Sequence, residues 1–311
     1  MSSTGTVQPG GATATETKRL GPSMPRGRKA TPRAGGGRGG WFPRIALTIA
    51  CILWLLPSIG LLVTSFRKSE AALNSGWWTV ITKPFSDWTF SNYTEVLEAG
   101  GSNAFLNSLA VSLPATVIPL LIATMAAYAF TFMDFPGRDL LFVIIVGLLV
   151  VPLQVALVPL LRIYGDIGLT GQFAAVWLAH AGFGMPLAIF ILRGYMATLP
   201  RAIIESAKID GASHFQSFWR LIVPMSVPAL ASFAIFQFLW TWNDLLVALI
   251  FLGPGENEVM TVNVAGLVGA QQQGWQLVTA GAFLSMVIPL LVFISLQRYF
   301  VRGLTAGSVK G

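Results

Sequence analysis

Charged residues, cysteine and histidine are all scarce in this chain. Only 11% of its 311 residues are Asp, Glu, Lys or Arg, whereas soluble domains carry about 25%. Cys51 stands alone inside an apolar run, and the two histidines are His180 and His214. The sequence therefore predicts neither a disulfide framework nor a metal site rich in cysteine or histidine. The shortage of charge argues against an ordinary soluble domain.

The usual signatures of catalysis are also missing. The sequence contains no G-x-S-x-G, H-E-x-x-H or G-x-x-x-x-G-K-[ST] motif. Away from the ends of the apolar runs, the ionisable residues are Asp244 and His180, too few for a proton relay. We expect His180 to be a buried histidine bonded to a neighbouring helix rather than a ligand. We also expect a protein that is not an enzyme and has no cofactor of its own, so that another chain supplies energy for uphill transport.

Apolar residues, by contrast, make up 54% of the chain. They form runs of about 20 residues, the length that crosses a hydrocarbon core roughly 30 Å thick. The sequence predicts an all-α polytopic membrane protein. Its six transmembrane helices are expected at Ile45–Phe66, Phe105–Met133, Leu140–Leu161, Phe173–Leu192, Val227–Phe251 and Leu277–Phe300.

The first 40 residues differ in composition, being rich in Gly, Pro, Ser and Thr, and eight of the 20 Lys and Arg residues lie in the first 44 positions. We expect a disordered basic cytoplasmic tail over 1–40 and a transmembrane domain over 41–311. Contact of "RGRK" and "GGRGG" with RNA or lipid is an alternative, but a tail that orients the first span explains them more simply, and no nucleic-acid partner is expected. The first apolar run is too long for a signal sequence, so we expect it to stay uncleaved.

The distribution of positive charge predicts the orientation in the membrane. If the N-terminus is cytoplasmic, the cytoplasmic segments hold sixteen Lys and Arg residues and the outer segments hold four. Positive residues concentrate on the cytoplasmic side of membrane proteins. Both termini are therefore expected in the cytoplasm.

The cytoplasmic loop between the fourth and fifth predicted spans, 194–226, contains the segment "IIESAKIDGAS". Its pattern predicts a helix from Pro200 to about Asp210, capped by Thr198 and ended by Gly211. Ser213 then begins "SHFQ", a capping-box pattern that predicts a second short helix. A later proline, at position 224, is expected to mark the return to the membrane.

Spacing places large and small apolar residues near one face of the first of these helices, namely Ile203, Ile204, Ala207 and Gly211. Such a face is typical of a helix that docks in a groove of another protein. An amphipathic helix lying on the bilayer would show the same spacing, so the spacing leaves both interpretations open.

Further residues of the loop carry a family resemblance. Glu205-Ser206-Ala207, then Gly211, then Leu221-x-Val223-Pro224 resembles the EAA loop of ABC importer membrane subunits, with mild departures at the serine, the leucine and the valine. The resemblance implies that the loop seats in a cytoplasmic ATP-hydrolysing subunit. The residues carried over are Ile203, Ile204, Glu205, Ala207, Asp210, Gly211 and Pro224.

Two other segments narrow the resemblance. "WTWNDLLVALIFLG" and the C-terminal "RYFVRGLTAGSVKG" are similar to the second membrane subunit of carbohydrate importers of the maltose and glycerol-phosphate type. The resemblance implies a type I ABC importer permease fold in the bacterial cytoplasmic membrane. It also implies four kinds of partner: a second permease subunit, two ATP-binding subunits, an extracytoplasmic solute-binding protein and a sugar. Alternatives are a non-sugar solute such as a phosphorylated polyol, a self-sufficient secondary carrier and a membrane-embedded enzyme.

The fifth predicted span carries polar residues that suit a sugar pathway. Gln237, Thr241 and Asp244 recur at i, i+4 and i+7, with Trp240 and Asn243 beside them. Lipid would penalise such a stripe, so it is expected to face protein or a water-filled cavity. The alternative is that these groups only bond to adjacent helices, and for Asp244 this alternative has the slight advantage.

The outer loop between the fifth and sixth spans, 252–276, is polar and glycine-rich. Its run Gln271-Gln272-Gln273 offers hydrogen-bond donors and acceptors together. Similarity to the maltose-type importers implies that this loop reaches toward a docked binding protein. A flexible, solvated connection without a task is the alternative.

Overall fold

The computed structural model describes Gly5 and residues 41–82, 86–270 and 274–306. Within these residues all regular structure is helical, apart from one isolated bridge between Arg67 and Trp88. The chain divides into two compact units, Met1–Leu53 and Trp54–Gly311. The helical bundle belongs to the second unit. The predicted disordered tail, 1–40, lies outside the described residues except for Gly5.

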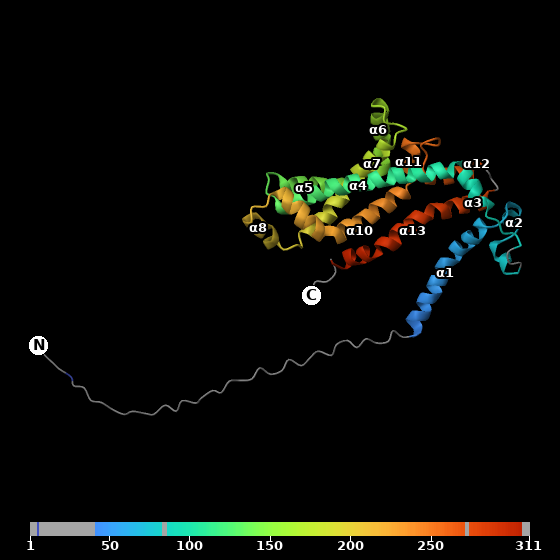
Figure 1. Ribbon diagram of the computed structural model, residues 1–311, viewed down its shortest axis with the longest axis horizontal. Helices are drawn as coiled ribbons and strands as arrows, with labels where there is room; N and C mark the ends of the chain where they lie inside the picture. The colour runs from blue at the N-terminus through green and yellow to red at the C-terminus, as the bar shows by residue number, and fades with distance from the viewer. Residues whose placement is uncertain (1–4, 6–40, 83–85, 271–273, 307–311) are drawn as a thin grey trace. The chain divides into compact units, whose positions relative to one another are not determined.

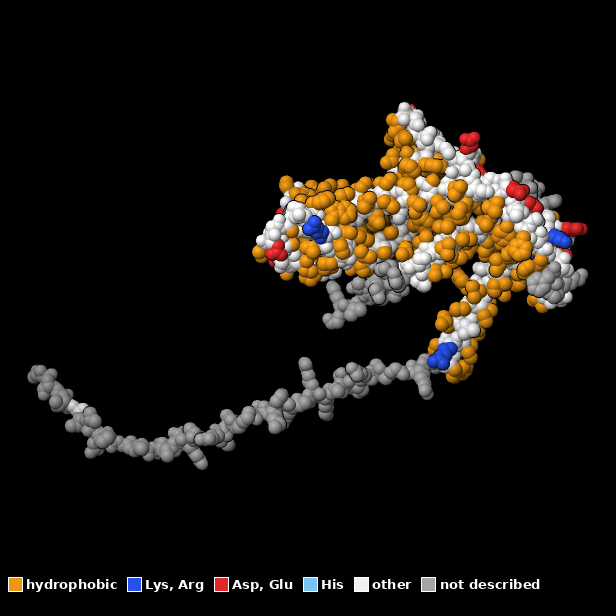
Figure 2. Space-filling model, in the orientation of Figure 1, with side chains coloured by type: hydrophobic (Ala, Val, Ile, Leu, Met, Phe, Trp, Pro, Cys, Tyr) orange, Lys and Arg blue, Asp and Glu red, His pale blue; other side chains and the backbone are white. Residues whose placement is uncertain are grey.

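Five long apolar helices can cross a membrane in the described part of the chain. They comprise α1 (Trp41–Ser65), α4 (Ser102–Phe132), α7 (Phe173–Met196), α10 (Val223–Trp242) and α13 (Trp275–Ala306). These helices confirm the all-α membrane fold and five of the expected spans. On the visible side of the bundle, hydrophobic side chains spread over the long helices while charged side chains gather toward the ends (Figure 2).

The third expected span is not one straight helix. It consists of α5 (Arg138–Gly147), a 3-10 turn η3 (Leu148–Val150) and α6 (Leu153–Asp166), with a bend of 99° between the two arms. Pro152 explains the break, because it lacks an N–H and forces the preceding Val151 into an extended conformation with ψ 117°. The span predicted over Leu140–Leu161 is thus formed by two helical arms instead of one straight helix.

The bent pair nevertheless has to return the chain across the bundle. The C-terminal ends of α4 and α7 line one cavity, with Thr131 and Arg193 among its walls. Near the other ends of these helices, Trp177 Nε1 donates to the Ala110 carbonyl at 3.1 Å. Helices α4 and α7 thus run parallel, side by side in Figure 1. A chain that leaves one parallel helix and enters the next must cross back between them, which makes the bent pair the sixth span.

The fifth expected span, Val227–Phe251, also differs from the prediction. Helix α9 (His214–Ser217) continues through the π-helical turn η4 (Phe218–Ile222) directly into α10, so the second loop helix is not separate. Pro224 follows η4 inside this continuous helix, and membrane helices accommodate such a proline through local π-helical adjustments. At the other end α10 stops at Trp242, and a break precedes α11 (Leu246–Phe251).

The bundle is built around α4, α7 and α10, which pack closely on one another (Figure 1). Small residues at the crossings let the backbones approach, as is usual between membrane helices. Ala127 and Ala188 are fully buried in this core, together with larger side chains such as Leu192 and Phe233.

Shorter elements form the end of the bundle that lies away from α8 (Figure 1). They are α2 (Ser69–Asn74), the 3-10 helix η1 (Trp77–Ile81), α3 (Ser91–Val96), the π-helical turn η2 (Leu97–Gly101) and α12 (Met260–Ala270). Helix α12 lies inside the loop 252–276, for which a flexible connection was the alternative interpretation, and Met260 is 1% exposed. Asn103 and Asn107 donate side-chain N–H groups to the Glu256 carbonyl, both at 2.8 Å. The described part of the loop 252–276 is therefore anchored to the bundle.

Candidate coupling surface and transport pathway

The first helix of the loop 194–226, α8 (Arg201–Ile209), forms where the sequence predicts it. It ends at Gly211, whose φ of +81° is the left-handed conformation that glycine adopts without strain. The Ser213 hydroxyl accepts from Gln216 N at 3.2 Å and Gln216 Oε1 accepts from Ser213 N at 2.9 Å. The predicted helix stop and capping box are thus confirmed. The predicted cap is not, because Thr198 donates to the Tyr195 carbonyl and Pro200 occupies the cap position.

The two faces of α8 are reversed relative to the expectation. Ile204 and Ala207 are 4% and 9% exposed, and Ile204 packs in the bundle core with Phe218. Ile203 is half-buried. The apolar face that was expected to meet a partner therefore holds α8 against its own chain. Periodicity shows that a helix has an apolar face, but not whether the chain's own core or a second protein covers it.

The outward side of this loop carries the remaining predicted residues. Its exposed members are Glu205, Asp210, Gly211 and Pro224. The sequence interpretation missed three exposed apolar side chains on the same loop: Ile209, Phe215 and Trp219, with exposed fractions of 86%, 72% and 42%. The sequence spacing could have indicated them. Ile209 follows Glu205 by one helical turn, which places it on the same side of the helix, and Phe215 and Trp219 are also one turn apart.

Two tyrosines attach this loop to the bundle. The Tyr128 hydroxyl on α4 lies 3.0 Å from His214 Nδ1 at the start of α9. The Tyr195 hydroxyl on α7 donates to the Met225 carbonyl at 3.2 Å. The loop is therefore joined to α4 and α7 by short side-chain contacts as well as by the backbone.

Among the pathway candidates, Gln237 has a structural task. Its side chain is fully buried, and Nε2 donates to the carbonyls of Ala115 and His180, both at 3.3 Å. Gly184 leaves room for it, since a Cβ there would stand 2.6 Å from Gln237 Oε1. Gln237 thus binds α4, α7 and α10 together, as the alternative interpretation expected.

Asp244 lies outside the helical stripe that the sequence predicted, because α10 ends at Trp242. Its Oδ2 accepts backbone N–H groups from Val247 at 2.9 Å and Ala248 at 3.2 Å, which caps the first turn of α11. The same oxygen lies 3.6 Å from His180 Nε2, and the two side chains are 11% and 1% exposed. The only two ionisable residues noted inside the apolar runs therefore face each other.

The remaining candidates surround this pair. Trp240 packs edge-on against the His180 ring with centroids 5.1 Å apart. Thr241 is buried, and Thr241 and Asp244 line a cavity of about 10 Å³, room for about one water molecule. Asn243 is exposed and donates to the Leu239 carbonyl at 2.7 Å. At this level the described residues are closely packed. The binding-protein candidates Gln271, Gln272 and Gln273 lie outside the described residues.

The described residues thus form an all-helical membrane bundle with a charged, amphipathic loop helix at one end. Residues 115–306 match the family described as "Binding-protein-dependent transport system inner membrane component", and the chain belongs to that family.

Two curated relatives are similar over most of this chain. The osmoprotective compounds uptake permease protein GgtD of Synechocystis is 55% identical over 86% of this chain and 91% of its own length. The alpha-glucoside transport system permease protein AglG of Rhizobium meliloti is 57% identical over 72% of this chain and 61% of its own length.

A solved structure shares the fold. A chain of a bacterial ABC transporter involved in the import of the acidic polysaccharide alginate superposes with a TM-score of 0.67 at 21% identity. The superposition covers 84% of this chain and 96% of that one. The type I importer fold implied by the sequence is thereby confirmed.

Proposed function

We propose that this chain is the permease subunit of an ATP-driven importer for a neutral sugar or glycoside. The observation that carries the proposal is the 57% identity with a permease named for alpha-glucoside transport. The wider family is defined by dependence on a binding protein. A second candidate cargo is an osmoprotective solute, which the 55% identity with GgtD favours.

Charge supports an uncharged cargo over a phosphorylated polyol. A phosphate group needs cationic partners, usually arginine or lysine. The small cavity beside Asp244 is lined by Ser, Val, Thr, Trp and Ala residues together with His180 and Asp244. No lysine or arginine is among these lining residues. Trp240 and Asn243 offer an aromatic face and an amide instead, groups that suit the apolar faces and hydroxyls of a sugar ring.

The energy for transport comes, in this proposal, from ATP bound by two partner subunits. The outward side of α8, with Glu205, Ile209 and Asp210, docks on one ATP-binding subunit, and Gly211 allows close approach. Exposed apolar side chains among polar ones are typical of such contacts. A second permease subunit completes the pore, and an extracytoplasmic binding protein delivers the solute through the outer loop that includes Gln271–Gln273. Both termini lie in the cytoplasm of a bacterium.

Reconstitution of the transporter in liposomes tests the proposal. With the second permease, the ATP-binding subunits and the binding protein present, we expect ATP-dependent uptake of a radiolabelled alpha-glucoside and no uptake of its 6-phosphate. The chain alone should neither transport nor hydrolyse ATP. Uptake by the chain alone would instead show a self-sufficient carrier, and uptake of an osmoprotective solute without the glucoside would select the second candidate.

A further inference from the structure

Three arginines from different elements line one cavity at the end of the bundle where α8 lies. They are Arg138 at the start of α5, Arg193 in the last turn of α7 and Arg201 at the start of α8. The cavity measures about 160 Å³, several times the ~10–15 Å³ that a single water requires. Its other walls include Thr131 and the ring of Phe132. Neither coupling nor transport, as argued above, uses this cavity.

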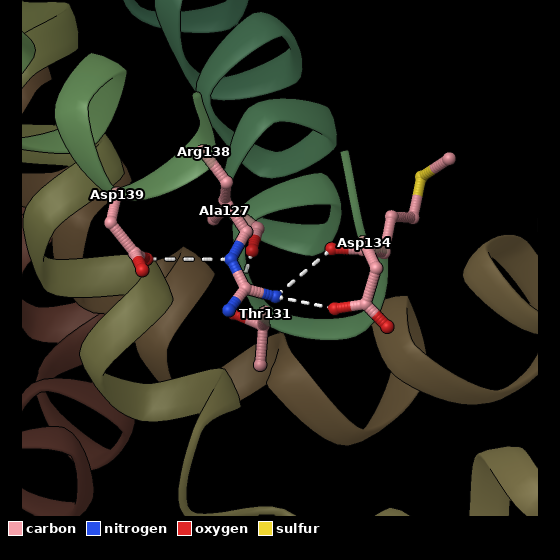
Figure 3. Close-up of polar contacts among 6 residues, drawn as sticks. Ala127, Thr131, Asp134, Arg138 and Asp139 are labelled. Atoms are coloured by element: carbon pink, nitrogen blue, oxygen red, sulfur yellow. Dashed lines mark hydrogen bonds and ion pairs between the residues drawn. The ribbon is translucent and has the colours of Figure 1, made fainter. Parts of the chain in front are cut away.

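The guanidinium groups are only partly neutralised. Arg138 forms ion pairs with Asp134 at 2.8 Å and Asp139 at 3.4 Å, and also donates to the Met133 carbonyl (Figure 3). Both carboxylates are largely in solvent, with side chains 99% and 80% exposed, so water screens their charge. The cavity therefore keeps a positive surplus.

The other two arginines have no carboxylate partner within the described residues. The Arg193 guanidinium carbon stands 3.9 Å from the centroid of the Phe142 ring. Stacking of this kind uses the face of the guanidinium and leaves its in-plane N–H groups able to donate. Arg201 is exposed and makes no ion pair with the described residues.

We propose that this cavity binds a phosphate group. Planar guanidinium donors match phosphate oxygens, and arginine is the residue that recognises them by paired hydrogen bonds. A phosphate can come from the headgroup of an anionic phospholipid or from the cytoplasm. The surroundings suit a lipid, because α5 leaves the cavity with Leu140, Val143 and Ile144 exposed at 66%, 65% and 53%, a surface for an acyl chain. Basic pockets between membrane helices bind headgroups in the same way.

The site would join three elements that the coupling loop has to move. Arg201 begins α8, whereas Arg138 and Arg193 belong to the span ends, so a bound phosphate would connect the loop helix to α5 and α7. This consequence rests on the proposed coupling function and on its cytoplasmic orientation. The phosphate chemistry of the cavity depends on neither.

Native mass spectrometry of the purified, assembled transporter tests the site directly. The complex is titrated with phosphatidylglycerol, with phosphatidylcholine as a headgroup of no net charge, and with inorganic phosphate as competitor. We expect retention of phosphatidylglycerol by the parent and a loss of affinity of about tenfold in R193Q and in R201Q, since each removes a charge-assisted contact. R220Q, at an exposed arginine away from the cavity, is the matched control.

The possible outcomes distinguish a lipid phosphate from a cytoplasmic phosphate, and both of these from the absence of a phosphate site. Loss of phosphatidylglycerol in R193Q and R201Q alone supports the site with a lipid phosphate. Binding of inorganic phosphate that these two variants weaken, without lipid retention, supports the site with a cytoplasmic phosphate. Equal weakening in R220Q, or no binding of either ligand by the parent, overturns it. Because binding is read without transport, the result is independent of the cargo and of coupling.

Discussion

Asp244 shows how one carboxylate in a membrane span can serve the fold. It caps α11 through two backbone N–H groups and lies against His180, while Thr261 donates to its backbone carbonyl at 2.7 Å. A buried acid within a span is by default a candidate for function. Here the geometry already gives Asp244 four partners on α7, α11 and α12, three of them at its carboxylate, which accounts for its position without any contact to a solute.

Substitution of Asp244 separates the cap from the charge. Asp244→Asn keeps an acceptor oxygen for the α11 N–H groups, so we expect the thermal midpoint of the purified complex to stay near that of the parent. Asp244→Ala removes the cap, at a cost of about 0.5–2 kcal/mol, and leaves His180 without its partner, so the midpoint should fall clearly. If the alanine variant has the same thermal midpoint as the parent, the cap does not contribute to stability. A role of Asp244 in the solute pathway would then be the better explanation of this carboxylate.

Gly211 gives a second prediction at the scale of one residue. It is exposed, has φ of +81°, and no atom lies within 4 Å of where its Cβ would be. Gly211→Ala introduces only the backbone strain, roughly 1–2 kcal/mol, whereas Gly211→Trp adds bulk on the docking side. We expect both variants to insert, the alanine variant to keep most of its solute-stimulated ATP hydrolysis, and the tryptophan variant to lose it. Normal stimulation in Gly211→Trp would contradict docking at this glycine.

At the scale of elements, local signals predicted local structure well. The glycine stop of α8 and the Ser213–Gln216 capping box depend on neighbours within four residues, so the sequence was sufficient for both. The 99° bend at Pro152 could also have been predicted, because a proline preceded by a β-branched valine disfavours a helix. The length of the apolar run indicated a span but not its bend. The pairing of His180 with Asp244 could not be predicted from the sequence, since only the packing of α7 against α10 and α11 brings the two side chains together.

Helix α8 provides the prediction at this scale, because two of its three isoleucines, Ile204 and Ile209, have opposite environments. Ile209→Asp changes an exposed side chain, so the permease should accumulate in membranes as the parent does but retain the ATP-binding subunit roughly tenfold less well, given about 1.5–3 kcal/mol for a buried isoleucine. Ile209→Leu, which keeps the apolar surface, should restore retention. Ile204→Asp places a charge in the core and should reduce the amount of folded permease itself. If Ile209→Asp retained the ATP-binding subunit as well as the parent does, the exposed side of α8 around Ile209 would not be part of the interface with that subunit.

At the scale of the whole molecule, the parallel run of α4 and α7 links the fold to the topology. If the bent pair crosses the membrane, α8 lies on the same side as the N-terminus. If it were re-entrant, α8 would lie on the opposite side. The sixteen-to-four distribution of Lys and Arg favours the first arrangement, and so does the cavity shared by the ends of α4 and α7. Accessibility measured on α8 and on α2 together therefore decides both the orientation and the number of crossings.

Single cysteines placed in a Cys51→Ala background make that measurement, since Cys51 is exposed in the native chain. Asn74→Cys on α2 and Ser206→Cys on α8 both replace exposed residues. With an impermeant maleimide we expect Asn74→Cys to react in intact cells and Ser206→Cys to react only after permeabilisation. Ser65→Cys, at a position with no exposed surface, should stay unlabelled in both conditions and shows that reaction reports exposure. Labelling of both Asn74→Cys and Ser206→Cys from outside would mean that the bent pair does not cross, and α8 could then not reach a cytoplasmic ATP-binding subunit.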